Sequence, residues 1–158
     1  MRPSIPKRIH AGFTLAEILI VISIIGIMAA ISLPRYGKLR DKSELSGAMS
    51  RFTRGVMAAR QVAIQRGKRA FFRHKDNSIW VIVDTTATDS VVVVSPTSLL
   101  DLYGVTVYEP TGVASIMYDP RGISTQVSQQ MFRFKHRSNI VDSLCVSRLG
   151  NTIRAKCL

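Results

Sequence analysis

The feature that most constrains this chain is an apolar run close to its N-terminus. From Phe13 to Leu33, twenty-one residues carry one formal charge, on Glu17. As an α-helix the run is about 31 Å long, at about 1.5 Å per residue, which is enough to span a bilayer. A carboxylate in such a helix costs several kcal/mol unless a cation pairs with it. The run therefore predicts a membrane-spanning helix, and Glu17 predicts a partner for its charge.

Charge is distributed in blocks along the 158 residues. Residues 1–12 carry three basic residues and no acid, and residues 35–75 carry twelve basic residues against two acids. Residues 76–120 carry six acids and no Lys or Arg, and residues 121–158 are basic again. A solvated helix face or a complementary contact with a neighbouring subunit explains the first large basic block. The overall basic balance is compatible with nucleic acid, acidic lipid or an acidic protein partner, and selects none of them.

Helical periodicity resumes after the apolar run and predicts that one helix of roughly fifty residues reaches Gly67. Gly26 and Pro34 are expected to weaken or kink this helix, because proline removes a backbone hydrogen bond. Gly67 is a typical C-terminal stop. The apolar positions recur at helical spacing and predict a buried stripe formed by Leu45, Ala48, Met49, Phe52, Val56, Ala59, Val62 and Ala63.

Beyond Gly67 the pattern predicts β-strands, so the expected fold class is α+β, with an antiparallel head. Asp76-Asn77-Ser78 is a candidate hairpin turn. The four valines 91–94 predict a strand buried on both faces, whereas "MFRFKHR" (131–137) alternates as an edge or half-exposed strand does. Two short strands are expected around Leu149-Gly150-Asn151, and the histidines at 74 and 136 are expected on exposed strands.

The stretch "GFTLAEILIVISIIGIMAAISLPRY" (12–36) resembles the N-terminus of type IV pilins and type II secretion pseudopilins. Charge alone leaves the membrane orientation open, and the "MAAIS" segment leaves a conventional cleaved signal possible. The resemblance implies cleavage by a prepilin peptidase between Gly12 and Phe13 on the cytoplasmic side, followed by N-methylation of Phe13. It implies a single-pass inner-membrane protein of a Gram-negative bacterium with its head in the periplasm.

The same resemblance gives Glu17 a role. After cleavage Glu17 is the fifth residue, about one helical turn from the new amino terminus, where a carboxylate is favoured. In the family this acid pairs with the terminal amine of a neighbouring subunit and sets the register of assembly. The alternative is an unpaired anion that faces water or reaches the membrane interface.

The strand pattern, "YDPRG" (118–122) and the "RGVMAARQVAIQRGKRAFFR" stretch resemble the GspH, FimT and FimU group of minor pilins and pseudopilins. The implied organisation is a leader at 1–12, a filament-core helix at 13–34, an amphipathic half-helix at 35–67 and a β-rich head at 68–158. The expected function is that of a minor type IV pilin that enters a pilus or primes its assembly, with a GspH-like pseudopilin as the alternative. The expected partners are other pilins or pseudopilins, the peptidase and the inner-membrane assembly platform.

Three further predictions concern sites in the head. Cys145 and Cys157 are expected to face each other on the two final strands and to form a disulfide in the oxidising periplasm, the alternative being two free thiols. A pilus-tip role in DNA uptake is a further alternative, in which the cations at 133, 135, 137, 148, 154 and 156 bind DNA. The family's C-terminal Gly-Arg-x-Arg segment is replaced here by "GNTIR" (150–154), and a solubilising surface or a subunit contact explains the same charges. No catalytic motif, cofactor or metal site is expected, so the chain is predicted not to be an enzyme.

Overall fold

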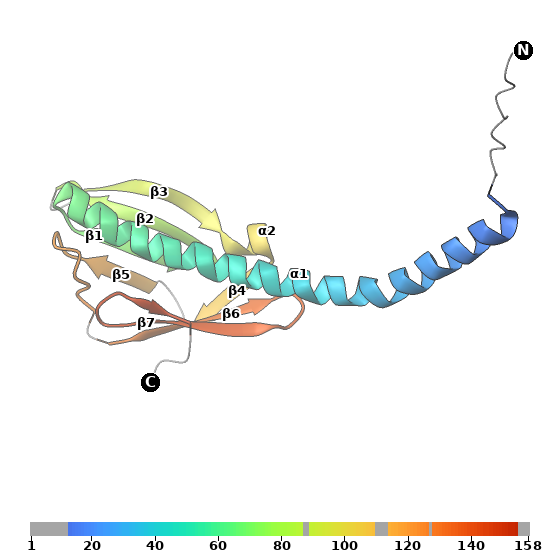
Figure 1. Cartoon of the computed structure of the whole chain (residues 1–158). Coiled ribbons are helices and arrows are strands. Elements are labelled where there is room, and N and C mark those ends of the chain that lie inside the picture. The colour runs from blue at the N-terminus through green and yellow to red at the C-terminus, as the bar shows by residue number, and fades with distance from the viewer. Residues whose placement is uncertain (1–12, 87–88, 110–113, 127, 155–158) are drawn as a thin grey trace, which may run out of the picture. The chain divides into compact units, whose positions relative to one another are not determined.

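The computed structural model describes residues 13–86, 89–109, 114–126 and 128–154 of the chain (Figure 1). The chain divides into two units, Met1–Lys38 and Leu39–Leu158, and each unit is described by itself. Helix α1 (Leu15–Arg66) contributes to both units. The other elements belong to the second unit: β1 (Ala70–Lys75), β2 (Ser78–Asp84), β3 (Ser90–Ser98), α2 (Leu99–Tyr103), β4 (Val105–Glu109), β5 (Ala114–Tyr118), β6 (Gln130–His136), β7 (Val141–Val146) and β8 (Thr152–Ile153). The expected fold class, a long N-terminal helix followed by an antiparallel β head, is confirmed.

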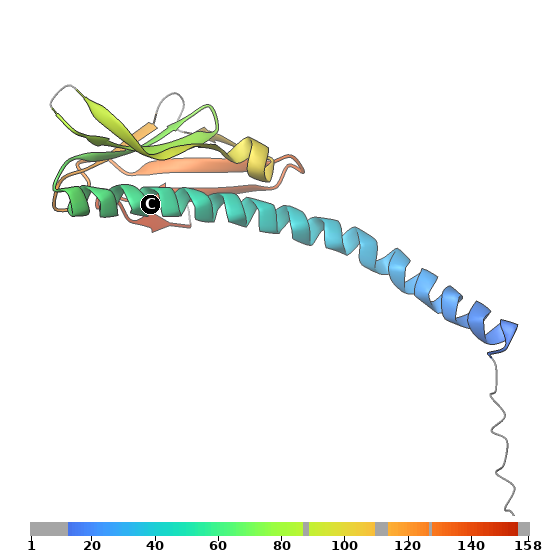
Figure 2. The same ribbon diagram turned by 90° about the horizontal axis from the view of Figure 1, so that it is seen from above.

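The strands of the second unit form two antiparallel sheets. The first sheet has the order β3-β2-β1-β5 and the second has the order β4-β6-β7-β8. The part of α1 that belongs to this unit runs along the sheets in both ribbon views (Figures 1 and 2). Its apolar stripe is buried, as helical spacing predicts: Leu45, Ala48, Met49, Phe52, Val56, Ala59 and Ala63 are in the core, and Val62 is partly buried against it.

Aromatic side chains join the helix to both sheets. The Phe52 ring on α1 lies 4.7 Å, centroid to centroid, from the Phe72 ring of the first sheet. It also lies 4.6 Å from the Phe132 ring and 5.3 Å from the Phe134 ring, both on β6 of the second sheet. Edge-on and tilted contacts at these distances are favourable beyond the apolar area that they bury. Phe52 therefore connects α1 to both sheets.

Tight turns lie where the sequence predicts them. Asp76 and Asn77 have φ angles of 49° and 63° and connect β1 to β2, with Lys75 paired to Ser78. Two consecutive left-handed residues are what a two-residue hairpin with the twist of the sheet requires. Gly67, at φ 59°, follows the last residue of α1, so the predicted helix stop is confirmed.

Two predictions about strands are wrong. The run Val91–Val94 is not buried on both faces, because β3 is an edge strand in which Val91 and Val92 are 44% and 52% exposed. His74 and His136 are not on exposed faces: they are only 3% and 5% exposed. Their side chains point to the core on the same face as the buried phenylalanines of β1 and β6. The half-exposed pattern of "MFRFKHR" is confirmed, with Arg133 and Lys135 pointing outward.

Candidate functional site

The N-terminal part of α1 presents an uncovered apolar surface. Every side chain from Phe13 to Ser32 is exposed. By length and composition α1 is able to cross a membrane, since an 18-residue window has a mean hydropathy of 2.5 and none of it is buried. A soluble domain rarely leaves so large a contiguous apolar surface in water. This surface requires a lipid or protein environment.

Glu17 closes a capping box at the start of this helix. The Glu17 backbone N–H lies 3.2 Å from Thr14 Oγ1, and the Thr14 backbone N–H donates to Glu17 Oε2 at 3.3 Å. This reciprocal pattern, with Thr14 at the N-cap and Glu17 three residues later, satisfies backbone donors that a helix start leaves unpaired. The Thr14 hydroxyl also donates to the same Oε2 at 3.3 Å. These contacts orient the carboxylate but supply no cation, so its charge remains uncompensated within the described residues.

The other residues singled out in this segment are only partly described. Gly12 lies outside the described residues, and Phe13 is exposed just before the helix. Gly26 and Pro34 both lie inside α1, so neither of them ends the helix. The predicted weakening at these two positions stays a prediction, as does processing at Gly12 and Phe13.

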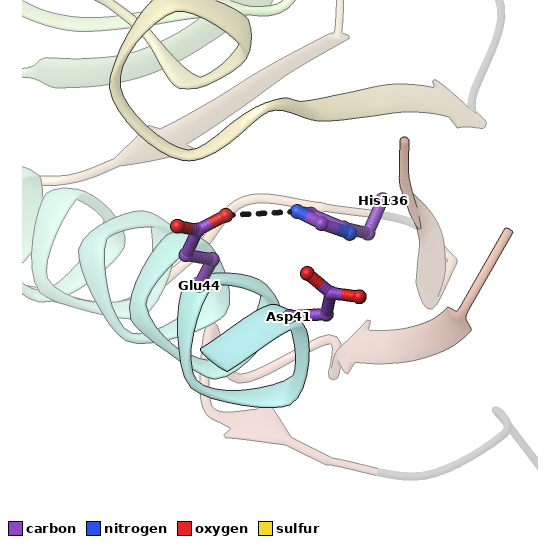
Figure 3. Close-up of side chains that lie close together, drawn as sticks. All are labelled: Asp41, Glu44 and His136. Carbon is purple, nitrogen blue, oxygen red and sulfur yellow. Dashed lines mark hydrogen bonds and ion pairs between the residues drawn. The ribbon is translucent and has the colours of Figure 1, made fainter. Parts of the chain in front are cut away.

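In the second unit the fold brings together a group that the sequence did not reveal. Asp41, Glu44 and His136 place one potential ligand atom each within 4.8 Å of one another, and we call this group the His136 cluster (Figure 3). His136 Nε2 lies 3.0 Å from Glu44 Oε2, and Arg40 Nε donates to Glu44 Oε1 at 2.8 Å. The hydrogen bond from Arg40, and secondly that from His136, hold the pKa of Glu44 below its usual value.

The sequence pattern predicts no metal site, and it predicts His136 on an exposed strand. The one local signal was Asp41-x-x-Glu44, because residues three apart share a helix face. His136 follows Glu44 by 92 residues in the sequence. The two residues meet only because β6, paired within the second sheet, packs next to α1. Such a long-range approach leaves no trace in local periodicity.

The residues predicted to bind DNA differ in exposure and in their contacts. Arg133, Lys135, Arg137 and Arg148 are exposed, and Lys156 lies outside the described residues. Arg154 donates from Nε and Nη2 to Asp142 Oδ2, at 2.9 Å and 2.8 Å. Its charge is therefore partly neutralised by a neighbouring strand. DNA binding stays a prediction.

The C-terminal hairpin is confirmed, but its register differs from the expected one. Cys145 pairs with Ile153 across β7 and β8, rather than standing opposite residue 157. The hairpin is therefore centred closer to Leu149 than to Asn151. Cys145 is disulfide-bonded. Its predicted partner Cys157 lies outside the described residues, so the pairing itself stays a prediction.

Comparison with known proteins gives this architecture a class. Residues 7–33 match the family described as the prokaryotic N-terminal methylation motif. The structure resembles the crystal structure of the type IV minor pilin FimU of Pseudomonas aeruginosa, with a TM-score of 0.57. That likeness covers 75% of this chain and 92% of the FimU chain at 12% identity, so it shows the fold alone. The chain is a type IV pilin-like protein with the pilin fold.

Named relatives support the same class. The chain is 41% identical over 64 residues to the type IV major fimbrial protein FimA of Dichelobacter nodosus. It is 50% identical over 44 residues to the fimbrial protein EcpC of Eikenella corrodens. These matches span 40% and 28% of this chain, and 39% and 29% of the two relatives. The chain therefore spans well under half of the length of these fimbrial proteins.

Proposed function

We propose that this chain is a minor type IV pilin of the FimT/FimU kind, which enters a pilus or primes its assembly and has no catalytic role. The observation that carries the proposal is the fully exposed apolar part of α1 with Glu17 at its start. Such a surface is stored in the inner membrane with the β-rich unit in the periplasm. It is then buried against the equivalent helices of other pilins.

Processing completes the assembly surface in this proposal. A prepilin peptidase cleaves after Gly12 and methylates the new terminus at Phe13, and the assembly platform of the inner membrane then extracts the subunit. Glu17 meets the terminal amine of a neighbouring subunit. The capping box supports this role because Thr14 already holds the carboxylate at the helix start, next to the site of the new terminus. Pairing in a medium of low dielectric is strongly favourable only when both charges are present.

A GspH-like pseudopilin of a type II secretion system is the alternative, since it would use the same helix and the same acid. Deletion of the gene separates the two possibilities. Loss of pili with normal export of folded proteins supports the pilin, and the opposite result supports the pseudopilin.

The central test compares Glu17→Gln with Asp101→Asn in the full chain. An amide oxygen at position 17 still accepts from the Thr14 N–H, so the cap is kept while the charge is lost. Asp101 is an exposed acid of the second unit and serves as the matched control. We expect normal processing of both variants and a large decrease of Glu17→Gln alone in sheared filaments, measured by immunoblot. Equal incorporation of the two variants contradicts the proposal.

Cleavage is tested separately by Gly12→Val. We expect this variant to accumulate as the longer, unprocessed species in the membrane fraction. If mass spectrometry finds a mature terminus at Phe13 in this variant, the peptidase does not read Gly12 and the assignment of the leader is wrong.

A further inference from the structure

The His136 cluster has the donor set of a transition-metal site, and we propose that it binds a Zn²⁺ ion. One imidazole nitrogen and two carboxylates face a common point in Figure 3. Three protein ligands of these types, with a fourth position left to water, are a recurrent arrangement around zinc. Nothing in a pilin's assembly through its apolar helix requires this group.

The three side chains come from elements that are fixed by the core. Asp41 and Glu44 lie one helical turn apart on the same face of α1, next to the buried Leu45. His136 is the last residue of β6, and its ring is buried with 5% of its surface exposed. A buried imidazole that contacts Glu44 at 3.0 Å, with the Asp41 carboxylate nearby, is positioned before any ion binds.

The charges of the cluster favour a cation. Asp41 has no hydrogen bond or ion pair with any described residue, although its carboxylate lies within 4.8 Å of the ligand atoms of Glu44 and His136. Arg40 binds Glu44 through Oε1, which leaves Oε2 directed at the imidazole. Two neighbouring carboxylates and one guanidinium leave a negative excess that a divalent ion reverses.

Ser138 allows the imidazole to become a ligand. Without metal, the Ser138 backbone N–H donates to His136 Nδ1 at 3.2 Å, so Nε2 carries the proton and donates to Glu44 Oε2. With metal, the proton moves to Nδ1 and is donated to Ser138 Oγ, which lies 2.8 Å away, while the Ser138 backbone N–H gives up its bond to Nδ1. The lone pair of Nε2 then points at the ion. A second partner that fixes the ring tautomer is typical of histidine ligands.

Coordination requires a small rearrangement of the cluster. Tetrahedral zinc with bonds of about 2.0–2.2 Å places its ligand atoms about 3.4 Å apart. The His136–Glu44 pair, at 3.0 Å, needs to widen only slightly, so the adjustment falls mainly on Asp41, which is half-buried. The bound ion would link α1 to β6 and stabilise the second unit.

The test measures the melting temperature, Tm, of the full chain in detergent, without a histidine tag, with ZnCl₂ or MgCl₂ against EDTA. We expect about one Zn²⁺ per chain by calorimetry, and a rise in Tm of about 5 °C or more at a hundredfold excess over Kd. Magnesium at the same concentration is expected to leave Tm unchanged, because it prefers oxygen ligands in octahedral geometry.

Matched variants assign the effect to the cluster. Asp41→Asn replaces a charged carboxylate ligand with a neutral, weakly coordinating amide without removing a hydrogen bond or ion pair to a described residue. We expect this variant to fold and to lose most of the zinc-dependent rise. His136→Gln is expected to lose all of it. His10→Gln, which changes a histidine of the N-terminal segment, is expected to keep the full response. Absence of a rise in the unaltered chain, or an equal rise in Asp41→Asn, overturns the proposal and leaves the cluster as a hydrogen-bonded link between helix and sheet.

Discussion

His74 makes the stability of the second unit depend on pH. Its ring is 3% exposed between Phe52 and Phe132, with centroid distances of 6.3 Å and 6.2 Å. Neither ring nitrogen has a hydrogen-bond partner among the described residues. Burial lowers the pKa of His74, and the nearby Asp76 carboxylate opposes this effect. The folded protein therefore holds this histidine in its neutral form.

The sign and size of the effect follow from linkage. Above about pH 6.5, the ordinary pKa of histidine, both the folded and the unfolded chain carry a neutral ring, and the full stability is present. As the pH falls below this value, the unfolded chain takes up a proton that the folded chain refuses, until the lowered folded pKa is reached. The free energy of unfolding then falls by at most about 1.4 kcal/mol per pH unit for this one proton.

His74→Leu removes this proton and the two nitrogens without partners. We expect the variant to be more stable than the parent by about 1–3 kcal/mol at pH 8, since two buried polar atoms without hydrogen bonds are replaced by apolar ones. We also expect the difference in stability to grow as the pH falls from 7 to 5. His136 is present in both proteins, so its contribution cancels in the difference.

The assay is urea denaturation of the full chain in detergent at several pH values, followed by the fluorescence of Trp80. This residue is the single tryptophan of the sequence and lies on β2, so it reports on the second unit. A difference that stays constant between pH 7 and 5 refutes the argument that His74 is held neutral. A variant that is less stable at pH 8 refutes the argument that its nitrogens are costly.

Two further predictions concern packing. Phe52→Ala is expected to lower the free energy of unfolding by about 3–5 kcal/mol in the same assay, because it removes the ring that contacts both sheets. A loss below about 1 kcal/mol contradicts that role. Gly150→Ala is expected to cost more than Gly67→Ala, which costs about 1 kcal/mol. Both glycines have positive φ, of 77° and 59°, but a Cβ at 150 meets the Tyr118 hydroxyl, whereas nothing lies within 4 Å at 67. Equal losses of stability in the two alanine variants contradict this steric account.

Local elements could be predicted from the sequence more accurately than the way those elements pack together. The helical stripe and the Gly67 stop were predictable because both depend on residues within one or two turns. The hairpin at Asp76 was predictable for the same reason. The run Val91–Val94 was misassigned because its composition fits a central strand, whereas its place at the edge depends on sheet order, which is a long-range property.

The candidate sites divide in the same way. Glu17 was identifiable because a single acid in an apolar run is conspicuous, although its capping partner Thr14 was overlooked. The His136 cluster was not identifiable, since one helix and one strand contribute to it from distant parts of the chain. The burial of His74 and His136 was not predicted, because each follows or precedes a basic residue and such a position is usually exposed. In a strand, however, adjacent side chains point to opposite faces, so the histidine is buried while its basic neighbour is not.

The position of Phe52 has a consequence for how the second unit loses its structure. Its ring contacts Phe72 from one sheet and Phe132 and Phe134 from the other, so neither sheet can separate from α1 without disturbing the contacts of its neighbour. The two sheets should consequently melt in one cooperative transition rather than in sequence. In hydrogen exchange, the central strands β1 and β6 should open with the same free energy, which is that of global unfolding. A subunit built in this way is either fully folded or fully unfolded, and no partly open head persists between the two states.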